Sequence, residues 1–178
     1  GSGSCRSLSM EETDGTTISA TLEARSIAFH SAFEERFNLS SRVEFTEKDI
    51  DAAKAALSST LGGIGFFYGI PRIGDSSAAS GSSKAQPEPI SLLTATPSRT
   101  AFPRGFLWDE GFHQQLLVNW DPQLAMRVLK HWLEAQYQCE GRPDLGGWMP
   151  RELILGDEAT SRVPDEFVTQ RVDVANPP

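Results

Sequence analysis

A twelve-residue segment at positions 102–113, FPRGFLWDEGFH, combines the side-chain types that bind and cleave sugars. It holds four aromatic rings, an arginine, two adjacent carboxylic acids and a histidine, although aromatic residues make up only 9% of the chain. A sugar ring offers apolar C–H faces to aromatic side chains and hydroxyl groups to charged ones, and breaking a glycosidic bond also requires a proton donor. The segment therefore predicts a site for a polyhydroxylated ligand.

Asp109 is the candidate proton donor. A carboxylic acid can protonate a leaving glycosidic oxygen when burial keeps it neutral, and Phe106, Trp108 and Phe112 are aromatic neighbours that could bury it. Glu110 points about 100° away from Asp109 around a helix, so the two acids cannot serve one bond from one face, and one of them is structural or binds a hydroxyl. Asp109 also has a purely structural explanation, because an acid in the first turn stabilises the positive end of the helix dipole.

His113 and the later segment GGWMPRE add candidates for sugar binding. His113 follows Asp109 by four positions and shares its helical face, where it either binds a sugar hydroxyl or holds the acid in place. Trp148 lies between glycines and a proline, so its ring either stacks on a sugar or anchors the loop. Arg151 and Glu152 either grip hydroxyls or pair with each other.

Charge and motifs argue against other function classes. The net charge of -8 and the pI near 4.9 oppose nucleic-acid binding, which needs a basic surface. No apolar run of ~18 residues and no signal-peptide pattern is present, which predicts a soluble chain or one cut from an anchored protein. His30, His113 and His131 lack the spacing of metal ligands, so neither a metal nor another cofactor is expected. Motifs for acyl and phosphoryl transfer are also missing.

Two helices are predicted before residue 64. Apolar side chains recur on one face between residues 19 and 37. A second helix begins after Thr46, which forms a capping box with Asp49, and it ends at the glycine pair 62–63. The apolar segment IGFFYGI at 64–70 is bounded by glycine and proline and predicts a buried strand.

The acids fall in a predicted helical hairpin that follows a loop. Residues 74–100 predict a long flexible loop, within which ISLLTAT at 90–96 forms a short strand. A helix over 109–119 carries the acids, and the pair Asp121-Pro122 begins a second helix that reaches Cys139. Segment 144–156 then predicts a loop that returns over the same end of the hairpin. Two tryptophans of the hairpin are assigned to its core, Trp120 and Trp132.

Three further features bear on processing. Cys5 and Cys139 fit one disulfide bridge or two free thiols equally well. Asn38-Leu39-Ser40 is an N-glycosylation sequon and hints at a lumenal location. Residues 1–15 predict a disordered terminus.

Residues 102–178 resemble the catalytic region of glycoside hydrolase family 63, the processing α-glucosidases. The resemblance is carried by the segment at 102–113 followed, in matching order and spacing, by GGWMPRE, PDEF and ANPP. Residues 16–72 are similar to the part that precedes this region in the family. The resemblance implies a mainly α fold in which 16–178 form part of an (α/α)6 barrel with its active site at the mouth.

The resemblance also implies a reaction, namely removal of the terminal α-1,2-linked glucose from the triglucosylated N-glycan precursor with inversion and without a metal. The implied location is the lumen of the endoplasmic reticulum, in a protein held by an N-terminal membrane anchor. Asp109 matches the family's general acid, whereas the family's general base has no counterpart in this chain. Since an inverting enzyme needs both carboxyls ~6.5 to 9.5 Å apart, the chain alone is expected to be a fragment with little or no glucosidase activity.

Eight side chains are expected to contact the glycan: Arg104, Phe106, Trp108, Glu110, His113, Trp148, Arg151 and Glu152. The alternative is a non-catalytic glycan-binding module or an inactive truncated one. Replacing Asp109 by Asn separates these hypotheses, because only an enzyme has turnover to lose.

Overall fold

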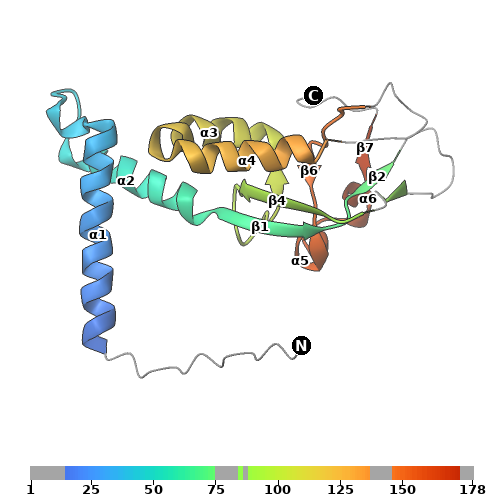
Figure 1. Cartoon of the computed structure of the whole chain (residues 1–178), viewed down its shortest axis with the longest axis horizontal. Helices are drawn as coiled ribbons and strands as arrows, with labels where there is room; N and C mark the ends of the chain where they lie inside the picture. The colour runs from blue at the N-terminus through green and yellow to red at the C-terminus, as the bar shows by residue number, and fades with distance from the viewer. Residues whose placement is uncertain (1–14, 75–83, 86–87, 137–145, 173–178) are drawn as a thin grey trace, which may run out of the picture. The chain divides into compact units, whose positions relative to one another are not determined.

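The computed structural model describes residues 15–74, 84–85, 88–136 and 146–172 of the chain (Figure 1). The chain consists of two compact units, Gly1–Lys54 and Ala55–Pro178. The described part is mainly helical, as the sequence predicts, with short strands between the helices. No helix of these four ranges is both long enough and apolar enough to cross a membrane.

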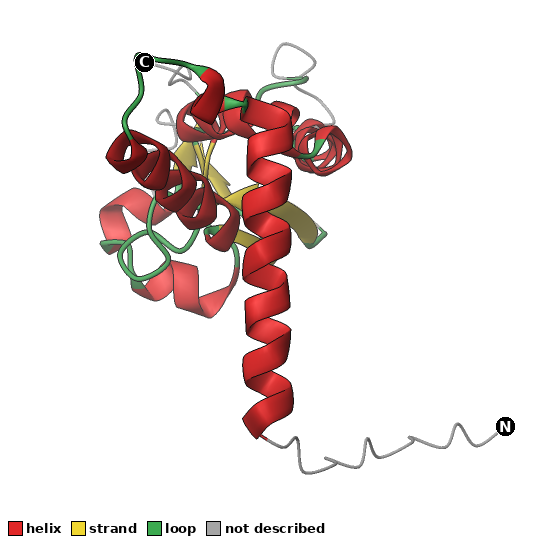
Figure 2. Cartoon of the chain, turned by 90° about the vertical axis from the view of Figure 1, so that its left-hand side faces the viewer, coloured by secondary structure: helices red, strands yellow, loops and turns green. Residues whose placement is uncertain are grey.

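The first unit begins with α1 (Gly15–Phe37), which starts earlier than the predicted helix and ends where expected. Figure 2 shows α1 as one unbroken helix. Phe29, Phe33 and Phe37 lie at four-residue spacing, with ring centroids 6.4 and 4.9 Å apart along the row. Asn38 then adopts a left-handed conformation with φ of 46°, which asparagine tolerates better than most residues, and the 3₁₀ helix η1 (Leu39–Ser41) follows.

Helix α2 (Glu47–Gly62) crosses the boundary between the units. The predicted capping box is present, since Asp49 Oδ2 accepts a 2.8 Å hydrogen bond from Thr46 N and Thr46 Oγ1 accepts one of 3.4 Å from Asp49 N. Gly62 ends the helix as expected.

In the second unit, β1 (Ile64–Gly69) pairs antiparallel with β4 (Ile90–Ala95), from Ile64↔Ala95 to Gly69↔Ile90. The strand predicted at 64–70 is confirmed, but its full burial is wrong. Successive strand side chains point to opposite faces, and Phe66 and Tyr68 lie on an exposed face.

Strand β4 confirms ISLLTAT and shows that the predicted loop at 74–100 is too broad. Leu92 and Thr94 of this strand are fully buried, so this part of the range belongs to the core. The rest of the range includes residues 75–83 and 86–87, which lie outside the described residues.

The predicted hairpin is formed by α3 (Leu107–Trp120) and α4 (Pro122–Glu134), which lie side by side over β4 in Figure 1. Asp121 caps α4 by accepting hydrogen bonds of 3.0 Å each from Gln123 N and Leu124 N. Helix α4 ends before the predicted Cys139, because Ala135 leaves helical geometry with ψ near 2°. Cys139 and Cys5 both lie outside the described ranges.

Burial on the hairpin follows the helical repeat. Ala125, Val128 and Trp132 of α4 are buried at i, i+3 and i+7, so Trp132 is in the core as predicted, whereas Trp120 is only half-buried. Other apolar side chains of α4 are exposed, namely Met126, Leu129 and Leu133, whereas Leu124 is half-buried against the core.

Short elements complete the unit. Strand β5 (Gly105–Phe106) pairs antiparallel with β6 (Glu152–Leu153), so the segment after α4 does return to the start of α3. Strand β2 (Arg72–Gly74) lies between β3 (Lys84–Ala85) and a parallel β7 (Gln170–Arg171). Helices α5 (Gly156–Ser161) and α6 (Asp165–Val168) form a small apolar cluster with Ile154 and Val163.

Candidate active site

The candidate acid lies in the first turn of α3, and the start of this helix is fixed by the chain that returns after α4. Leu107 N donates a 3.0 Å hydrogen bond to Arg151 O. The first amide groups of a helix lack partners within it, so this bond satisfies one of them. Gly105 is required just before, because a Cβ there would lie 2.6 Å from Leu92 Cδ2 and 2.9 Å from Trp132 Cζ2.

Asp109 itself is partly exposed, and the structure gives it no hydrogen bond or ion pair to the residues it describes. Trp108 and Phe112 contact each other edge to face, with centroids 5.1 Å apart, but they are 58% and 55% exposed. The aromatic burial expected around Asp109 is therefore not supplied by these two rings within the described part. Asp109 therefore keeps part of its surface exposed among the described residues.

Glu110 has the opposite environment, since only 2% of its surface is exposed. Its Oε2 accepts hydrogen bonds from the Thr94 hydroxyl and, at 3.1 Å, from Ala95 N. Its Oε1 accepts a hydrogen bond from Gln114 Nε2. Both carboxylate oxygens are therefore bonded to protein donors, which suits a structural anchor better than the predicted glycan contact.

Neighbouring polar groups keep Glu110 ionised. Burial acts to raise the pKa of this carboxyl group, but His113, Thr94 and Gln114 together outweigh burial and lower the pKa below its ordinary value. His113 Nδ1 lies 3.9 Å from Glu110 Oε2, which is within ion-pair distance and longer than a normal hydrogen bond.

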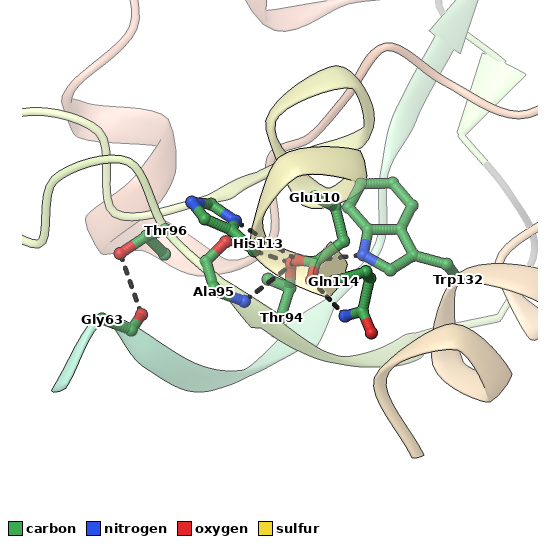
Figure 3. Close-up of polar contacts among 8 residues, drawn as sticks. All are labelled: Gly63, Thr94, Ala95, Thr96, Glu110, His113, Gln114 and Trp132. Carbon is green, nitrogen blue, oxygen red and sulfur yellow. Dashed lines mark hydrogen bonds and ion pairs between the residues drawn. The ribbon is translucent and has the colours of Figure 1, made fainter. Parts of the chain in front are cut away.

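The anchor extends from α3 through β4 to α4. Trp132 Nε1 donates a hydrogen bond of 3.2 Å to Thr94 Oγ1, whose hydroxyl in turn donates to Glu110 (Figure 3). Beside it, Thr96 Oγ1 donates to Gly63 O at 3.1 Å. The turn that carries Asp109 is thus tied to the buried strand and to the second helix of the hairpin.

Arg104 fixes the other side of this turn. It is 6% exposed, and its Nε donates a 2.8 Å hydrogen bond to Glu152 Oε2. Its guanidinium carbon lies 4.7 Å from the Phe106 ring centroid and 5.4 Å from that of Phe102, within cation–π range. Arg151 Nη2 lies 3.5 Å from Glu152 Oε1. The predicted pair of Arg151 and Glu152 is therefore present. The buried partner of Glu152, however, is Arg104.

Trp148 and Arg151 border a cavity of about 210 Å³ that does not include Asp109 among its lining residues. The predicted glycan-binding residues therefore fall into two groups. The first group lies at the start of α3 and consists of Arg104, Phe106, Trp108, Glu110 and His113. The second group, Trp148 and Arg151, lines the separate cavity. Glu152 connects the two groups, because it contacts both Arg104 and Arg151.

Sequence reasoning missed Thr94 and Gln170, which hold these groups in place. Thr94 lies in an apolar strand, and its hydroxyl there signals a buried hydrogen bond. Gln170 Oε1 accepts a 3.2 Å hydrogen bond from Glu152 N, for which the sequence offers no local signal. Within the described ranges, no three His, Cys, Asp or Glu side chains are grouped as metal ligands.

A helical hairpin that presents a partly exposed acid beside exposed aromatic rings is compatible with binding of a sugar. Comparison with known proteins gives the family. Residues 13–178 match the C-terminal domain of glycosyl hydrolase family 63, and the chain belongs to this family, as the resemblance predicted.

Three relatives illustrate the match. The chain is 40% identical to alpha-glucosidase 2 of Arabidopsis thaliana over 92% of its own length and 20% of that protein. It is also 40% identical to a mannosyl-oligosaccharide glucosidase of the same plant, over 92% of this chain and 18% of the relative. The mannosyl-oligosaccharide glucosidase of Saccharomyces cerevisiae is 42% identical over 76% of this chain and 17% of its own. The chain thus spans about one fifth of the length of these curated relatives.

Proposed function

We propose that this chain supplies the general-acid part of an inverting mannosyl-oligosaccharide glucosidase, with Asp109 as the acid. The reaction is removal of the terminal α-1,2-linked glucose from the triglucosylated N-glycan precursor. The observation that carries the proposal is the contrast between two adjacent acids in a chain of this family. Glu110 is buried and bonded on both oxygens, whereas Asp109 is accessible at the same helix start.

This contrast assigns a role to each acid. Glu110 anchors α3 on β4 through Thr94 and Ala95, so the helix start cannot move toward or away from a bound sugar. Asp109, one position before Glu110, is then held in place while its own oxygens have no hydrogen-bond donor among the described residues. A positioned acid of this kind contributes typically 10² to 10⁴-fold to the rate of bond cleavage.

The proposal extends to the fold and the location. The hairpin α3–α4 would form one pair of helices in an (α/α)6 barrel, and its exposed apolar side chains Met126, Leu129 and Leu133 suit packing against further helices. The endoplasmic reticulum lumen follows from the substrate, and the exposed sequon at Asn38 is compatible with it. The general base of the reaction is not assigned to any residue described here.

The experiment uses a full-length protein that contains this chain and measures hydrolysis of two substrates. One is an oligosaccharide that ends in an α-1,2-linked glucose, and the other is α-glucosyl fluoride. The fluoride leaves without being protonated. We expect Asp109→Asn to lower kcat on the oligosaccharide by about 10² to 10⁴-fold while largely sparing the fluoride. Proton NMR should show the β-anomer of glucose as the first product, which reports inversion.

The matched control is Asp157→Asn, which changes an exposed acid in the first turn of α5 and should leave both rates unchanged. Equal loss of both activities in Asp109→Asn would reject the role of proton donor. A wild-type protein that binds the glycan but never releases glucose would instead favour a glycan-binding module.

A further inference from the structure

We infer that the cavity beside Trp148 is a second sugar subsite, which binds a neutral hexose unit of the glycan other than the glucose that is cleaved. The inference rests on the proposed function for the identity of the glycan. The cavity measures about 210 Å³, and its lining includes Trp148, Arg151, Glu166 and Phe167. Pockets for drug-sized ligands measure about 300 to 1,000 Å³, so this one suits a single ring.

The lining has the chemistry of a sugar site. Trp148 is half-buried and Phe167 is 60% exposed, so aromatic surface is available for the C–H face of a pyranose ring. Arg151 keeps 48% of its side chain exposed and has donors beyond the one that faces Glu152. Glu166 is exposed and adds an acceptor. The lining also includes Thr169 and a second arginine, Arg171, so donors outnumber acceptors. Sugar hydroxyl groups both donate and accept, and they can therefore bond to the arginines and to Glu166 at once.

The walls of the cavity are held in place before any ligand binds. Gln170 is buried, and its side chain joins the two walls, since Oε1 accepts a 3.2 Å hydrogen bond from Glu152 N and Nε2 donates one of 3.3 Å to Phe167 O. Strand β7 is in turn paired with β2, through Ile73↔Gln170. A preformed site avoids most of the entropy cost of ordering its side chains on binding.

The cavity adjoins the start of α3. Arg151 lines the cavity with its side chain, while its carbonyl oxygen accepts the 3.0 Å hydrogen bond from Leu107 N, two positions before Asp109. A glycan whose terminal glucose lies at Asp109 could therefore place a neighbouring unit in the cavity.

The test measures binding to the intact protein that carries Asp109→Asn, by titration calorimetry, so that hydrolysis does not interfere. The probes are glucose, an α-1,2-linked glucose disaccharide and a longer glucose-terminated oligosaccharide of the glycan branch. We expect Glu166→Gln and Phe167→Ala each to weaken binding of the longer probe by about tenfold, and to leave binding of at least one shorter probe, the disaccharide or glucose itself, unchanged. A preference for the longer probe in the parent protein is also expected.

The matched controls are Asp165→Asn, an exposed acid beside Glu166, and Phe66→Ala, an exposed aromatic residue on β1. Neither residue lines the cavity, and neither variant should alter binding. Unchanged affinity for the longer probe in both cavity variants, or equal losses for every probe, would overturn the subsite. Binding of inorganic phosphate that competes with the longer probe would also overturn it, in favour of an anion site.

These outcomes are separate from those that test Asp109. If the fluoride experiment rejects Asp109 as the acid but the cavity variants lose affinity selectively, the subsite stands and the catalytic assignment fails. If Asp109 is the acid and the cavity variants bind normally, the subsite alone fails.

Discussion

Arg104 Nε and Glu152 Oε2 are joined by a 2.8 Å hydrogen bond although the residues are 48 positions apart, and their side chains are only 8% and 14% exposed. The pair links the residue just before β5 to β6 and so fixes the chain that leads into α3. Glu152 also faces Arg151 at 3.5 Å, so one carboxylate balances two guanidinium groups. Removing that carboxylate would leave a buried cation without its partner.

Replacement of Glu152 by Ala is therefore expected to lower the free energy of unfolding by about 3 to 5 kcal/mol, the usual cost of breaking a buried ion pair. Urea denaturation measures the change. The control is Glu134→Ala, which removes the exposed pair of Lys130 and Glu134, whose side chains are 72% and 56% exposed. That loss should be about 0 to 1 kcal/mol, and losses of equal size would contradict a special role for Glu152.

Replacement of Glu110 by Gln is expected to lower the free energy of unfolding by about 1 to 3 kcal/mol at pH 7. Both carboxylate oxygens of Glu110 accept hydrogen bonds. In the Gln variant one of these oxygens is replaced by an NH2 group, which would face a donor and could not accept its hydrogen bond. Chemical denaturation measures the change, and Glu35→Gln on the exposed face of α1 serves as the control. A loss no larger than that of the control would show that the network is not needed.

The effect of Glu110→Gln should also depend on pH. The pKa of Glu110 in the folded protein lies below its ordinary value of 4.5. The stabilisation from its ionised form is therefore fully present above about pH 4.5 and is lost as the pH falls through the folded-state pKa. The stability difference between wild type and variant should shrink over that range, and a difference that stays constant from pH 7 down to the acid limit of folding would refute the linkage.

Alanine at two glycines near the acid should have opposite effects. A Cβ at Gly105 would meet Leu92 at 2.6 Å and Trp132 at 2.9 Å, both buried, so Gly105→Ala should destabilise by about 1 to 3 kcal/mol. A Cβ at Gly111 meets nothing within 4 Å and lies inside α3, where Ala is favoured over Gly by up to about 1 kcal/mol. Thermal unfolding of both variants distinguishes the two, and destabilisation by Gly111→Ala would indicate contacts that this structure does not include.

The cap of α4 provides a local test. Asp121→Ala should cost about 1 kcal/mol, because it removes an acceptor bonded to two amide groups, whereas Asp121→Asn should cost little since asparagine caps as well as aspartate. Urea denaturation again measures both changes. If the two variants were equally destabilised, charge rather than capping would be the cause.

Much of the local structure follows from sequence because its causes are local. The capping box of Thr46 and Asp49, the stop at Gly62 and the cap at Asp121 each depend on residues within three positions. The predicted end of α4 at Cys139 is wrong, because the apolar pattern continues to Tyr137 while the helix stops at Glu134. The spacing of apolar residues indicates which side chains are suited to burial. It does not indicate where the surface that buries them ends, and so it does not give the end of the helix.

The site was predictable in its residue types and not in its pairings. The motif marked Asp109 and Glu110, and the angle between neighbours on a helix predicted that their roles differ. Which of them is buried depended on Thr94 in β4 and Trp132 in α4, which approach α3 only in the folded chain. Arg151 was the obvious partner for Glu152 in sequence, whereas the buried partner, Arg104, comes from a distant segment.

The pairing of β5 with β6 also constrains the order of folding. Contacts between α3 and α4 are local and close a short loop, whereas Arg104 and Glu152 must close a loop of 48 positions, which costs more chain entropy. The hairpin of α3 and α4 can therefore form first. The start of α3 becomes fixed only when residues 152 and 153 pair with β5. Pulsed hydrogen exchange during refolding should accordingly protect amides in the middle of α3 and α4 before that of Leu107.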